Sequence, residues 1–261
     1  MKIVYISKSI IPSRTANSIH VMKMCQAFSK NGHDVTLLAP FQKNKYEKGI
    51  VDIYDYYGVK NNFVIKKLWH PNFKGGALFY TLAIFFYLFF NNKFNLVYGR
   101  FLYGCCLASL LKFKVIFESH ENICAKQNFK LKIFKYLIKS KYFIKLVVIS
   151  NALKNMYLES SYLDNKIIQV AHDGADEILD KNIKIKLFGD NNSLKVGYVG
   201  HLYNGRGIDI IIECAKKIKD VTFHIVGGTK DDIEYWKNYT NNLRLFNIYF
   251  YGFVSPKITV S

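Results

Sequence analysis

The chain has 261 residues, of which 50% are hydrophobic, so it can bury a sizeable core as one large domain or two ordinary ones. This composition excludes an intrinsically disordered protein. Its 37 Lys and Arg residues against 19 Asp and Glu give a formal net charge of +18. Such a charge favours anionic partners, whether nucleotide phosphates, acidic lipid headgroups or nucleic acid, and does not by itself choose among them.

The cysteines and the apolar runs bear on the compartment. The five cysteines form an odd set without a CxxC pair, which indicates neither a zinc knuckle nor a disulfide framework and fits a reducing cytoplasm. The opening MKIVYIS contains an apolar run too short for a signal peptide and is typical of a strand. The longest apolar run, 77–90, is shorter than the ~20 residues that span a bilayer, so we expect a buried or interfacial helix there.

The first forty residues alternate strand, helix and strand. Apolar patterning predicts a strand at 2–6, a helix at 18–30 and a strand at 35–39. This order opens a parallel, doubly wound sheet, in which ligands bind beyond the carboxyl ends of the strands. We therefore expect the loop 7–17 to face a cleft.

The same alternation continues to about residue 170. Weak strands are expected at 52–57 and 62–68. Further strands are predicted at 96–98, 114–117, 145–149 and 167–170, and helices at 77–90, 102–111, 127–141 and 151–159. Ser150 is expected to cap the last of these helices rather than to act as a nucleophile. The strand 114–117 brings Glu118 to Glu121 to the same sheet edge as the loop 7–17.

A change of composition separates two domains. Residues 177–193 are charged, Asn-rich and aperiodic, which predicts a first domain at 1–178, a connection at 179–193 and a second domain at 194–261. The second domain is expected to hold strands at 195–199, 221–226 and 248–251, with helices at 207–219 and 231–245. An open parallel sheet normally needs more strands than these, so we expect this domain to be incomplete.

A series of motifs in chain order spans nearly the whole sequence: MKIVYIS, NGHDVTLL, IFESHE, KLVVISNAL, QVAHDGADE, KVGYVGHLYNGRGID, FHIVGG and IYFYGFVSP. The series resembles the retaining glycosyltransferases of family 4. That resemblance implies an α/β protein of the GT-B fold, with two Rossmann-like parallel-sheet domains. It also implies transfer of a sugar from a nucleotide sugar to a glycolipid or surface-polysaccharide acceptor, with retention of configuration, in cell-envelope polysaccharide biosynthesis.

The resemblance places the nucleotide-sugar site in the second domain. Glycines after the strand would let the backbone approach the diphosphate, and the helix that begins near Gly207 would direct its positive end toward it. Arg206 would clamp phosphate and stabilise the departing nucleotide, whereas the alternative for it is a solvated residue at a turn. His201 stands where many relatives carry Arg. The implied set is Gly200, His201, Arg206, Gly207, Gly227 and Gly228.

The resemblance also assigns the first domain's cleft. His120 matches the family's cleft histidine, which positions the transferred sugar, so His120 and Arg206 are the implied catalytic residues. The alternative for His120 is a histidine that only completes local hydrogen bonds. Asp173 and Gly174 resemble a hinge motif, with an expected turn and interface role. The expected acceptor-side residues are Asn17, Ser18, His20, Glu118 and Glu121.

One family feature is missing from the sequence. Members carry two glutamates eight positions apart in the second domain, and no two glutamates here have that spacing. We therefore expect weak binding of the nucleotide sugar and slow or no turnover. The alternative is a non-catalytic, degenerate GT-B protein that binds a membrane or a partner transferase. The sequence also contains no Asp-x-Asp, the metal-nucleotide signature of the other large glycosyltransferase fold, so we expect no metal and no other cofactor at the nucleotide-sugar site.

A basic segment predicts membrane contact. Residues 126–145 contain seven lysines and no acidic residue, and Phe129, Ile133, Tyr136 and Leu137 can share one helical face. Such segments lie on anionic bilayers, where each Lys adds ~1 kcal/mol. The alternative is a helix that covers the sheet while its lysines extend into water. We expect a cytoplasmic protein, peripheral on the inner face of the membrane, and no nucleic-acid partner because no base-reading motif accompanies the charge.

Overall fold

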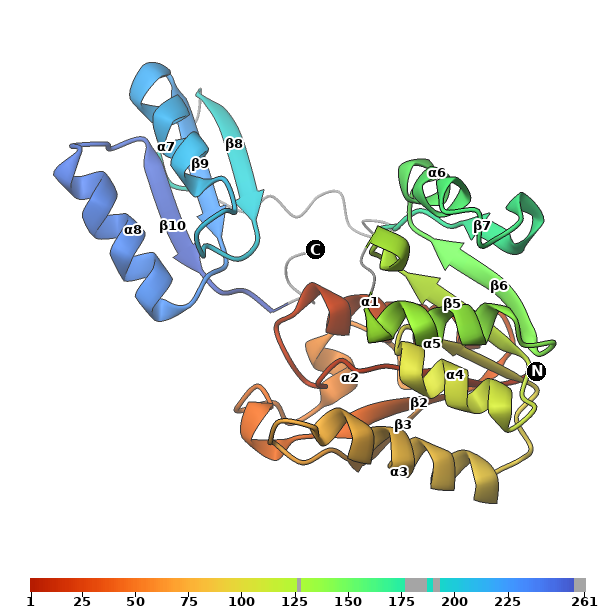
Figure 1. Ribbon diagram of the computed structural model, residues 1–261. Coiled ribbons are helices and arrows are strands. Elements are labelled where there is room, and N and C mark those ends of the chain that lie inside the picture. Colours follow the sequence, from red (N-terminus) through yellow and green to blue (C-terminus); the bar gives the residue numbers. More distant parts are fainter. Residues whose placement is uncertain (126–127, 177–186, 190–192, 256–261) are drawn as a thin grey trace. The chain divides into compact units, whose positions relative to one another are not determined.

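The computed structural model describes residues 1–125, 128–176, 187–189 and 193–255. The chain divides into two compact units, 1–176 and 177–261, and each is built on a parallel sheet with helices packed against it (Figure 1). The predicted domain boundary at residue 178 and most of the predicted connection lie outside the described residues. Both units have the βα alternation that the sequence predicted.

The first unit contains a seven-stranded sheet in the order β3-β2-β1-β4-β5-β6-β7, and every neighbouring pair is parallel. Its strands are β1 Lys2–Ile6, β2 Asp34–Phe41, β3 Val64–Trp69, β4 Leu96–Gly99, β5 Val115–Ser119, β6 Phe143–Val148 and β7 Ile168–Val170. Its helices are α1 Ala16–Lys30, α2 Ile53–Tyr56, α3 Gly76–Phe90, α4 Leu102–Leu110, α5 Phe129–Ile138 and α6 Asn151–Glu159. Short 3₁₀ turns occupy Lys43–Lys45, Ile123–Ala125 and Asn165–Ile167.

The other strands of this sheet lie on both sides of β1. From β1 the chain first goes to β2 and β3 on one side, and it then crosses back to β4 and continues to β7 on the other. Because such crossovers are right-handed, α1 and α2 lie on one face, while α3 to α6 lie on the opposite face and share one apolar core. The carboxyl ends of β1, β4 and β5 meet at this switch point, which is where sheets of this type bind ligands.

Helix α3 is tied to the switch point by one buried tyrosine. The hydroxyl of Tyr80 donates to the backbone oxygen of Ser7 at 2.6 Å and lies 3.0 Å from that of Leu38. Ser7 follows β1 and Leu38 belongs to β2, so this contact fixes the helix to the ends of two adjacent strands. No helix among the described residues is long and apolar enough to cross a membrane.

Most predicted elements agree with the structure to within a few residues at their ends, and one is wrong. Residues 52–57 were expected as a weak strand, but Ile53–Tyr56 form the short helix α2. Asp52 caps it, because its Oδ1 accepts from the amides of Tyr54 at 2.7 Å and Asp55 at 3.2 Å. The expected cap at Ser150 is confirmed by a bond from the Leu153 amide to its Oγ at 3.1 Å.

The second unit is a three-stranded parallel sheet in the order β10-β9-β8. Its elements are β8 Leu194–Val199, α7 Ile208–Lys217, β9 Val221–Val226, α8 Lys230–Asn242 and β10 Ile248–Gly252. Side chains of both helices and of β9 form its core, including Ile208, Ile212, Phe223 and Ile225. β8 lies at one edge of the sheet and leaves Leu194 and Val199 exposed. The expectation that this domain is incomplete stays a prediction.

Two glycine loops of the second unit touch through their backbones. Gly227 follows β9 with a φ of +118°, and a Cβ on it would lie 2.0 Å from the backbone oxygen of Gly200, which follows β8. Only glycine permits both that φ and that approach. The loops that end β8 and β9 therefore depend on glycine at this position.

We expect Gly227→Ala to destabilise the second unit much more than Gly205→Ala. Both positions have positive φ, which costs ~1–2 kcal/mol for alanine, but a Cβ on Gly205 has no neighbour within 4 Å. The contact with Gly200 should add ~1–3 kcal/mol or more. Hydrogen exchange of β9 amides measures the difference, and equal protection in the two variants would contradict the backbone contact.

Candidate functional site

A cavity of about 730 Å³ lies in the first unit at the switch point of the sheet. Its walls come from the loops after β1, β4 and β5, and they include Asn17, Arg100, Phe101 and His120. The charged side chains around it are Lys8, Lys45, Arg100, Lys130, Glu118 and Glu121. This excess of basic groups suits an anionic or hydroxyl-rich ligand.

The loop after β1 is held in shape from beneath. The buried hydroxyl of Tyr57 accepts from the Ser13 amide at 2.7 Å and donates to the Ser13 oxygen at 2.9 Å. Ser18 is fully buried, and its hydroxyl lies 2.9 Å from the Ser13 oxygen and 2.8 Å from that of Thr15. The prediction that Ser18 faces an acceptor is therefore wrong, because its side chain is used to build the loop.

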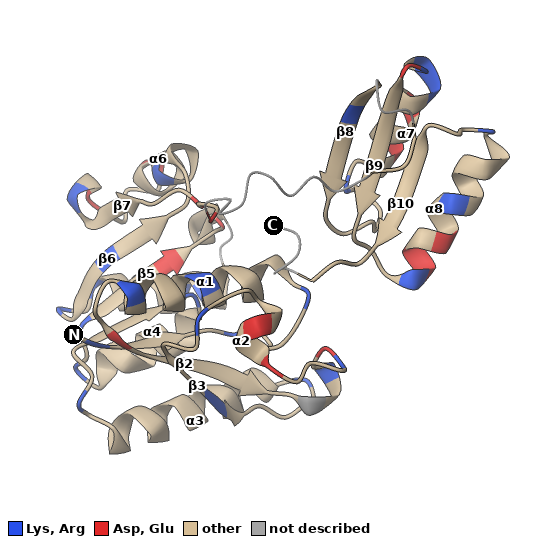
Figure 2. Ribbon diagram, turned by 180° about the vertical axis from the view of Figure 1, so that it is seen from behind, with Lys and Arg blue, Asp and Glu red and all other residues tan. Residues whose placement is uncertain are grey.

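Glu118 is the most buried charged residue beside the cavity, with 3% of its side chain exposed. It is the acidic residue of β5 and appears as the red segment of that strand in Figure 2. Its Oε2 accepts a hydrogen bond from Tyr98 at 2.8 Å and a longer one from Tyr5 at 3.4 Å. Its Oε1 lies 2.5 Å from Nε2 of His120 and 3.6 Å from Nε of Arg100.

These neighbours keep Glu118 ionised. Burial alone raises the pKa of this carboxyl, but the hydrogen bonds from His120 and Tyr98 and the close approach of His20 outweigh it, so the net pKa lies well below 4.5. Burial and the negative charge of Glu118 both raise the pKa of Tyr98 above 10.0. The tyrosine hydroxyls therefore stay protonated and act as hydrogen-bond donors to a fixed negative charge.

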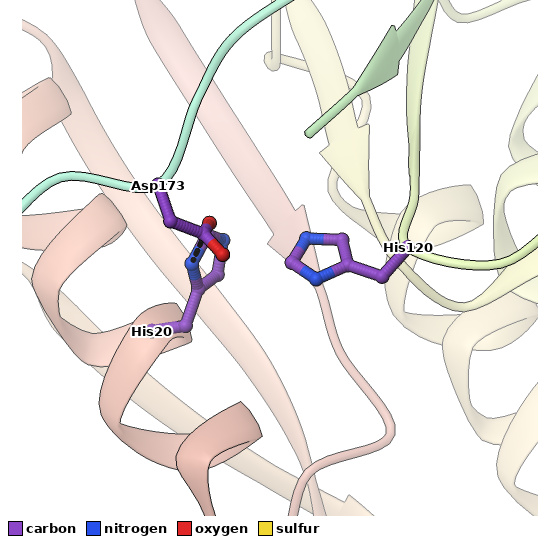
Figure 3. Close-up of side chains that lie close together, drawn as sticks. All are labelled: His20, His120 and Asp173. Carbon is purple, nitrogen blue, oxygen red and sulfur yellow. Dashed lines mark ion pairs between the residues drawn. The ribbon is translucent and has the colours of Figure 1, made fainter. Parts of the chain in front are cut away.

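Two histidines and an aspartate from three elements lie close together (Figure 3), and both histidines contact the Glu118 carboxylate. His20 lies on α1, and its Nε2 is 2.8 Å from Oε1 of Glu118 without the alignment of a hydrogen bond. Its Nδ1 lies 3.4 Å from Oδ1 of Asp173, which follows β7. The rings of His20 and His120 meet edge to face, with centroids 5.1 Å apart.

The structure brings most of the predicted acceptor-side residues together. The cavity is lined by Asn17, Glu118, His120 and Glu121. His20 is not among the lining residues, but it contacts Glu118. Glu121 is exposed and forms an ion pair with Lys130. Asp173, for which the sequence predicted a turn role, stands beside His20, while Gly174 has no neighbour within 4 Å of a Cβ position.

In the second unit, the predicted nucleotide-sugar residues lie on the loops after β8 and β9. Arg206 is exposed, and its guanidinium donates to the hydroxyl of Tyr203 and stacks 4.6 Å from the centre of that ring. Gly207 caps α7 with a φ of +81° and offers no side chain there. The first amides of α7 have no partner within the helix, so they are available to an anion.

Two of the predicted glycines do not offer free amides. The amide of Gly200 donates to the oxygen of Val226 at 3.0 Å, and that of Gly227 donates to the oxygen of Gly252 at 2.7 Å. Their contribution is the close approach of two backbones rather than hydrogen bonds to phosphate. Gly228 has a φ of +80° against Leu202, and the backbone oxygen of His201 accepts from Tyr198 at 2.7 Å.

The sequence analysis missed three residues whose side chains contact Glu118, namely Tyr5, Tyr98 and Arg100. Tyr5 and Tyr98 are paired in register on β1 and β4, and Arg100 follows β4. A signal was present, because a glutamate inside an apolar strand needs partners when it is buried. Finding those partners required the strand order, which places β1 and β4 next to each other and β4 next to β5.

Two Rossmann-like units with all-parallel sheets define the fold class of this chain, which is the GT-B type. No protein-family model matches the sequence. The chain is 27% identical, over an alignment of 285 positions including gaps, to the uncharacterized glycosyltransferase MJ1069 of Methanocaldococcus jannaschii, and the alignment covers 97% of this chain and 69% of that protein.

Solved structures of low sequence identity share the fold. A sucrose-phosphate synthase from Thermosynechococcus elongatus matches with a TM-score of 0.69 at 14% identity, over 99% of this chain and 72% of that one. HepE of Anabaena, in complex with UDP-glucose, matches with a TM-score of 0.65 at 13% identity, over 99% of this chain and 71% of that one. At these identities the likeness shows the fold alone.

We expect Glu118→Gln to lower the free energy of unfolding of the first unit by ~3–5 kcal/mol at neutral pH, because Arg100 is left without its buried counter-charge. The folded pKa of Glu118 is lowered, so its stabilisation is full above 4.5, the ordinary value, and is lost as the pH falls through the folded pKa. Denaturant unfolding of both proteins from pH 7 to pH 3 should show the difference shrinking below about pH 4.5.

Glu121→Gln serves as the control, because Glu121 is exposed and should change stability by no more than ~0.5 kcal/mol. If the two variants behave alike, or if the difference grows toward low pH, the carboxylate of Glu118 does not hold the cluster as described.

Proposed function

We propose that this chain is a glycosyltransferase of the family 4 type, which moves a sugar from a nucleotide sugar to a glycolipid or surface-polysaccharide acceptor with retention of configuration. The observation that carries the proposal is the switch-point cavity, in which His120 is held by the buried carboxylate of Glu118. The similarity to a glycosyltransferase of Methanocaldococcus jannaschii and the fold shared with HepE, solved with UDP-glucose, support it.

In this proposal Glu118 positions His120 rather than reacting itself. Its Oε1 lies 2.5 Å from Nε2 of His120, and because the carboxylate is ionised, it accepts a hydrogen bond from this nitrogen when the nitrogen carries the proton. That contact leaves Nδ1 of His120 as the ring's other polar atom. Because both oxygens of Glu118 are already engaged by neighbours, this carboxylate is a poor nucleophile.

The nucleotide would be held by the second unit. The first amides of α7 and the guanidinium of Arg206 supply positive charge for a diphosphate, and that charge stabilises a departing nucleotide without a metal ion. In a front-face retaining reaction the leaving phosphate accepts the proton of the acceptor hydroxyl, so no enzyme nucleophile is required.

We also propose that the first unit lies on an anionic membrane surface through the layer formed by α3, α4 and α5. Helix α4 packs against both of the others, so their outer sides are continuous. Helix α3 carries no charged residue, as its tan ribbon in Figure 2 shows. It exposes a row of large apolar side chains, namely Leu78, Leu82, Phe86, Phe89 and Phe90.

Helix α5 supplies charge beside that row. It buries Leu131, Phe134 and Leu137 against the sheet and exposes Phe129 and Tyr136. The predicted face of Phe129, Ile133, Tyr136 and Leu137 is therefore divided, because Leu137 belongs to the core while Phe129 and Tyr136 are exposed. The helix thus covers the sheet while it presents aromatic rings and lysines outward, an arrangement that is compatible with both alternatives for this segment.

Binding of UDP-glucose, measured by calorimetry, tests the first proposal. Arg206→Ala should weaken binding by about 10- to 150-fold, as expected for the loss of a charge-assisted bond of ~1.5–3 kcal/mol. Lys217→Ala removes a charge from the opposite end of α7 and should leave affinity unchanged. If no nucleoside diphosphate sugar binds the wild-type chain, a non-catalytic binding protein becomes the better interpretation.

Flotation with vesicles tests the membrane proposal. The chain should float with vesicles that contain phosphatidylglycerol and not with neutral ones. Changing the exposed Lys132, Lys139 and Lys141 to Gln should reduce the partition coefficient by about 100-fold, at ~1 kcal/mol for each charge. The same change at Lys217, Lys219 and Lys237 in the second unit removes equal charge and should have little effect. If both triple variants lose the same amount of vesicle binding, the protein is attracted to the membrane only by its net charge, and the layer of α3, α4 and α5 is not the binding surface.

A further inference from the structure

We propose that His20, His120 and Asp173 bind one divalent transition-metal ion of the Zn²⁺ type at the edge of the cavity. Each of the three offers a ligand atom, and these atoms lie within 4.8 Å of one another. They come from α1, from the loop after β5 and from the loop after β7, so the fold rather than a local motif brings them together (Figure 3).

The shared carboxylate behind the two rings prepares them as ligands. Nε2 of His120 and Nε2 of His20 lie 2.5 and 2.8 Å from the same oxygen of Glu118. The hydrogen bond to this ionised carboxylate favours a proton on Nε2 of His120, and the nearby negative charge favours the same for Nε2 of His20, although that contact is not aligned as a hydrogen bond. A proton on both Nε2 atoms leaves a lone pair on each Nδ1. Metal-binding histidines usually have such a carboxylate on the ring nitrogen that does not bind the metal, and it fixes both tautomer and orientation.

The distance between His20 and Asp173 fits two ligands of one ion. Nδ1 of His20 lies 3.4 Å from Oδ1 of Asp173. Bonds of ~2.0 Å to a tetrahedral Zn²⁺ separate neighbouring ligand atoms by roughly 3.3 Å. With the proton of His20 on Nε2, two lone pairs face each other at this distance, and a cation between them would relieve the repulsion. A proton on Nδ1 of His20 is the competing occupant.

The ligand types select the metal. Two imidazoles with one carboxylate suit Zn²⁺ and its neighbours better than Mg²⁺ or Ca²⁺, which prefer oxygen ligands. Three protein ligands leave the fourth position of a tetrahedral ion open to water or to an oxygen of a bound ligand. Because 57% of the Asp173 side chain is exposed, an ion can enter without unfolding the unit. No metal is expected at the diphosphate site of the second unit.

Titration of the full chain with ZnCl₂, followed by calorimetry, tests the site, and visible absorption of bound Co²⁺ reports its geometry. A Cys124→Ser, Cys214→Ser background removes the partly exposed thiols as competing ligands. We expect one ion per chain and a tetrahedral Co²⁺ spectrum. His120→Ala and Asp173→Asn should each weaken binding at least tenfold, and Asp173→Asn lies on an exposed loop where it does not threaten folding.

His172→Ala is the matched control, since His172 is an exposed histidine next to Asp173 that is not one of the three ligands. Its affinity for Zn²⁺ should equal that of the parent. The proposal is overturned if the parent binds no Zn²⁺, if His172→Ala loses as much affinity as Asp173→Asn, or if His120→Ala binds normally. Because no nucleotide sugar is present, failure here leaves the proposed transferase function standing.

Discussion

The buried, ionised carboxylate of Glu118 is the constraint around which the first unit is organised. Removing such a charge from water costs several kcal/mol, and only well-placed partners offset that cost. Here they come from several elements: Tyr98 on β4, Arg100 after β4, His20 on α1 and His120 after β5. The carboxylate thereby fixes the positions of the groups that face the cavity.

The position of that carboxylate follows from the topology of the sheet. Strands β2 and β3 lie on one side of β1, and β4 to β7 lie on the other. The carboxyl ends of β1, β4 and β5 are therefore adjacent, and the loops that follow them diverge. The divergence opens the cavity, and the buried hydroxyls of Tyr57 and Tyr80 hold its rim. A rigid rim with polar groups in fixed tautomers suits recognition of a sugar, and it equally suits a metal ion bound between two histidines.

In the second unit, glycine loops rather than a buried charge shape the carboxyl end of the sheet. Gly200 and Gly227 bring two loops into backbone contact, and α7 begins beside them without a side-chain cap. Because no side chain caps the positive end of α7, that end is available to bind an anion. Charge in this protein is therefore organised at three places: a buried anion in the first unit, open helix amides with Arg206 in the second, and lysines beside the apolar row of α3.

The sequence by itself determined the order and type of most elements, because parallel strands buried on both faces read as continuous apolar runs and helices as periodic ones. It failed at α2, where a weak strand was expected at 52–57 and the cap at Asp52 begins a short helix instead. It also named His120, Glu118 and His20 through a family resemblance, and it placed Ser18 in the cleft, although the hydrogen bonds of the loop bury that side chain.

Only the tertiary structure decided which of these residues meet. Tyr5, Tyr98 and Glu118 are far apart in the chain, and the order of strands puts them side by side. The same holds for His20 and Asp173, which a loop after the last strand of the first sheet brings to 3.4 Å. Local patterns carry no information about such distances, because the pairing of strands is set by packing over the whole sheet rather than by any one segment.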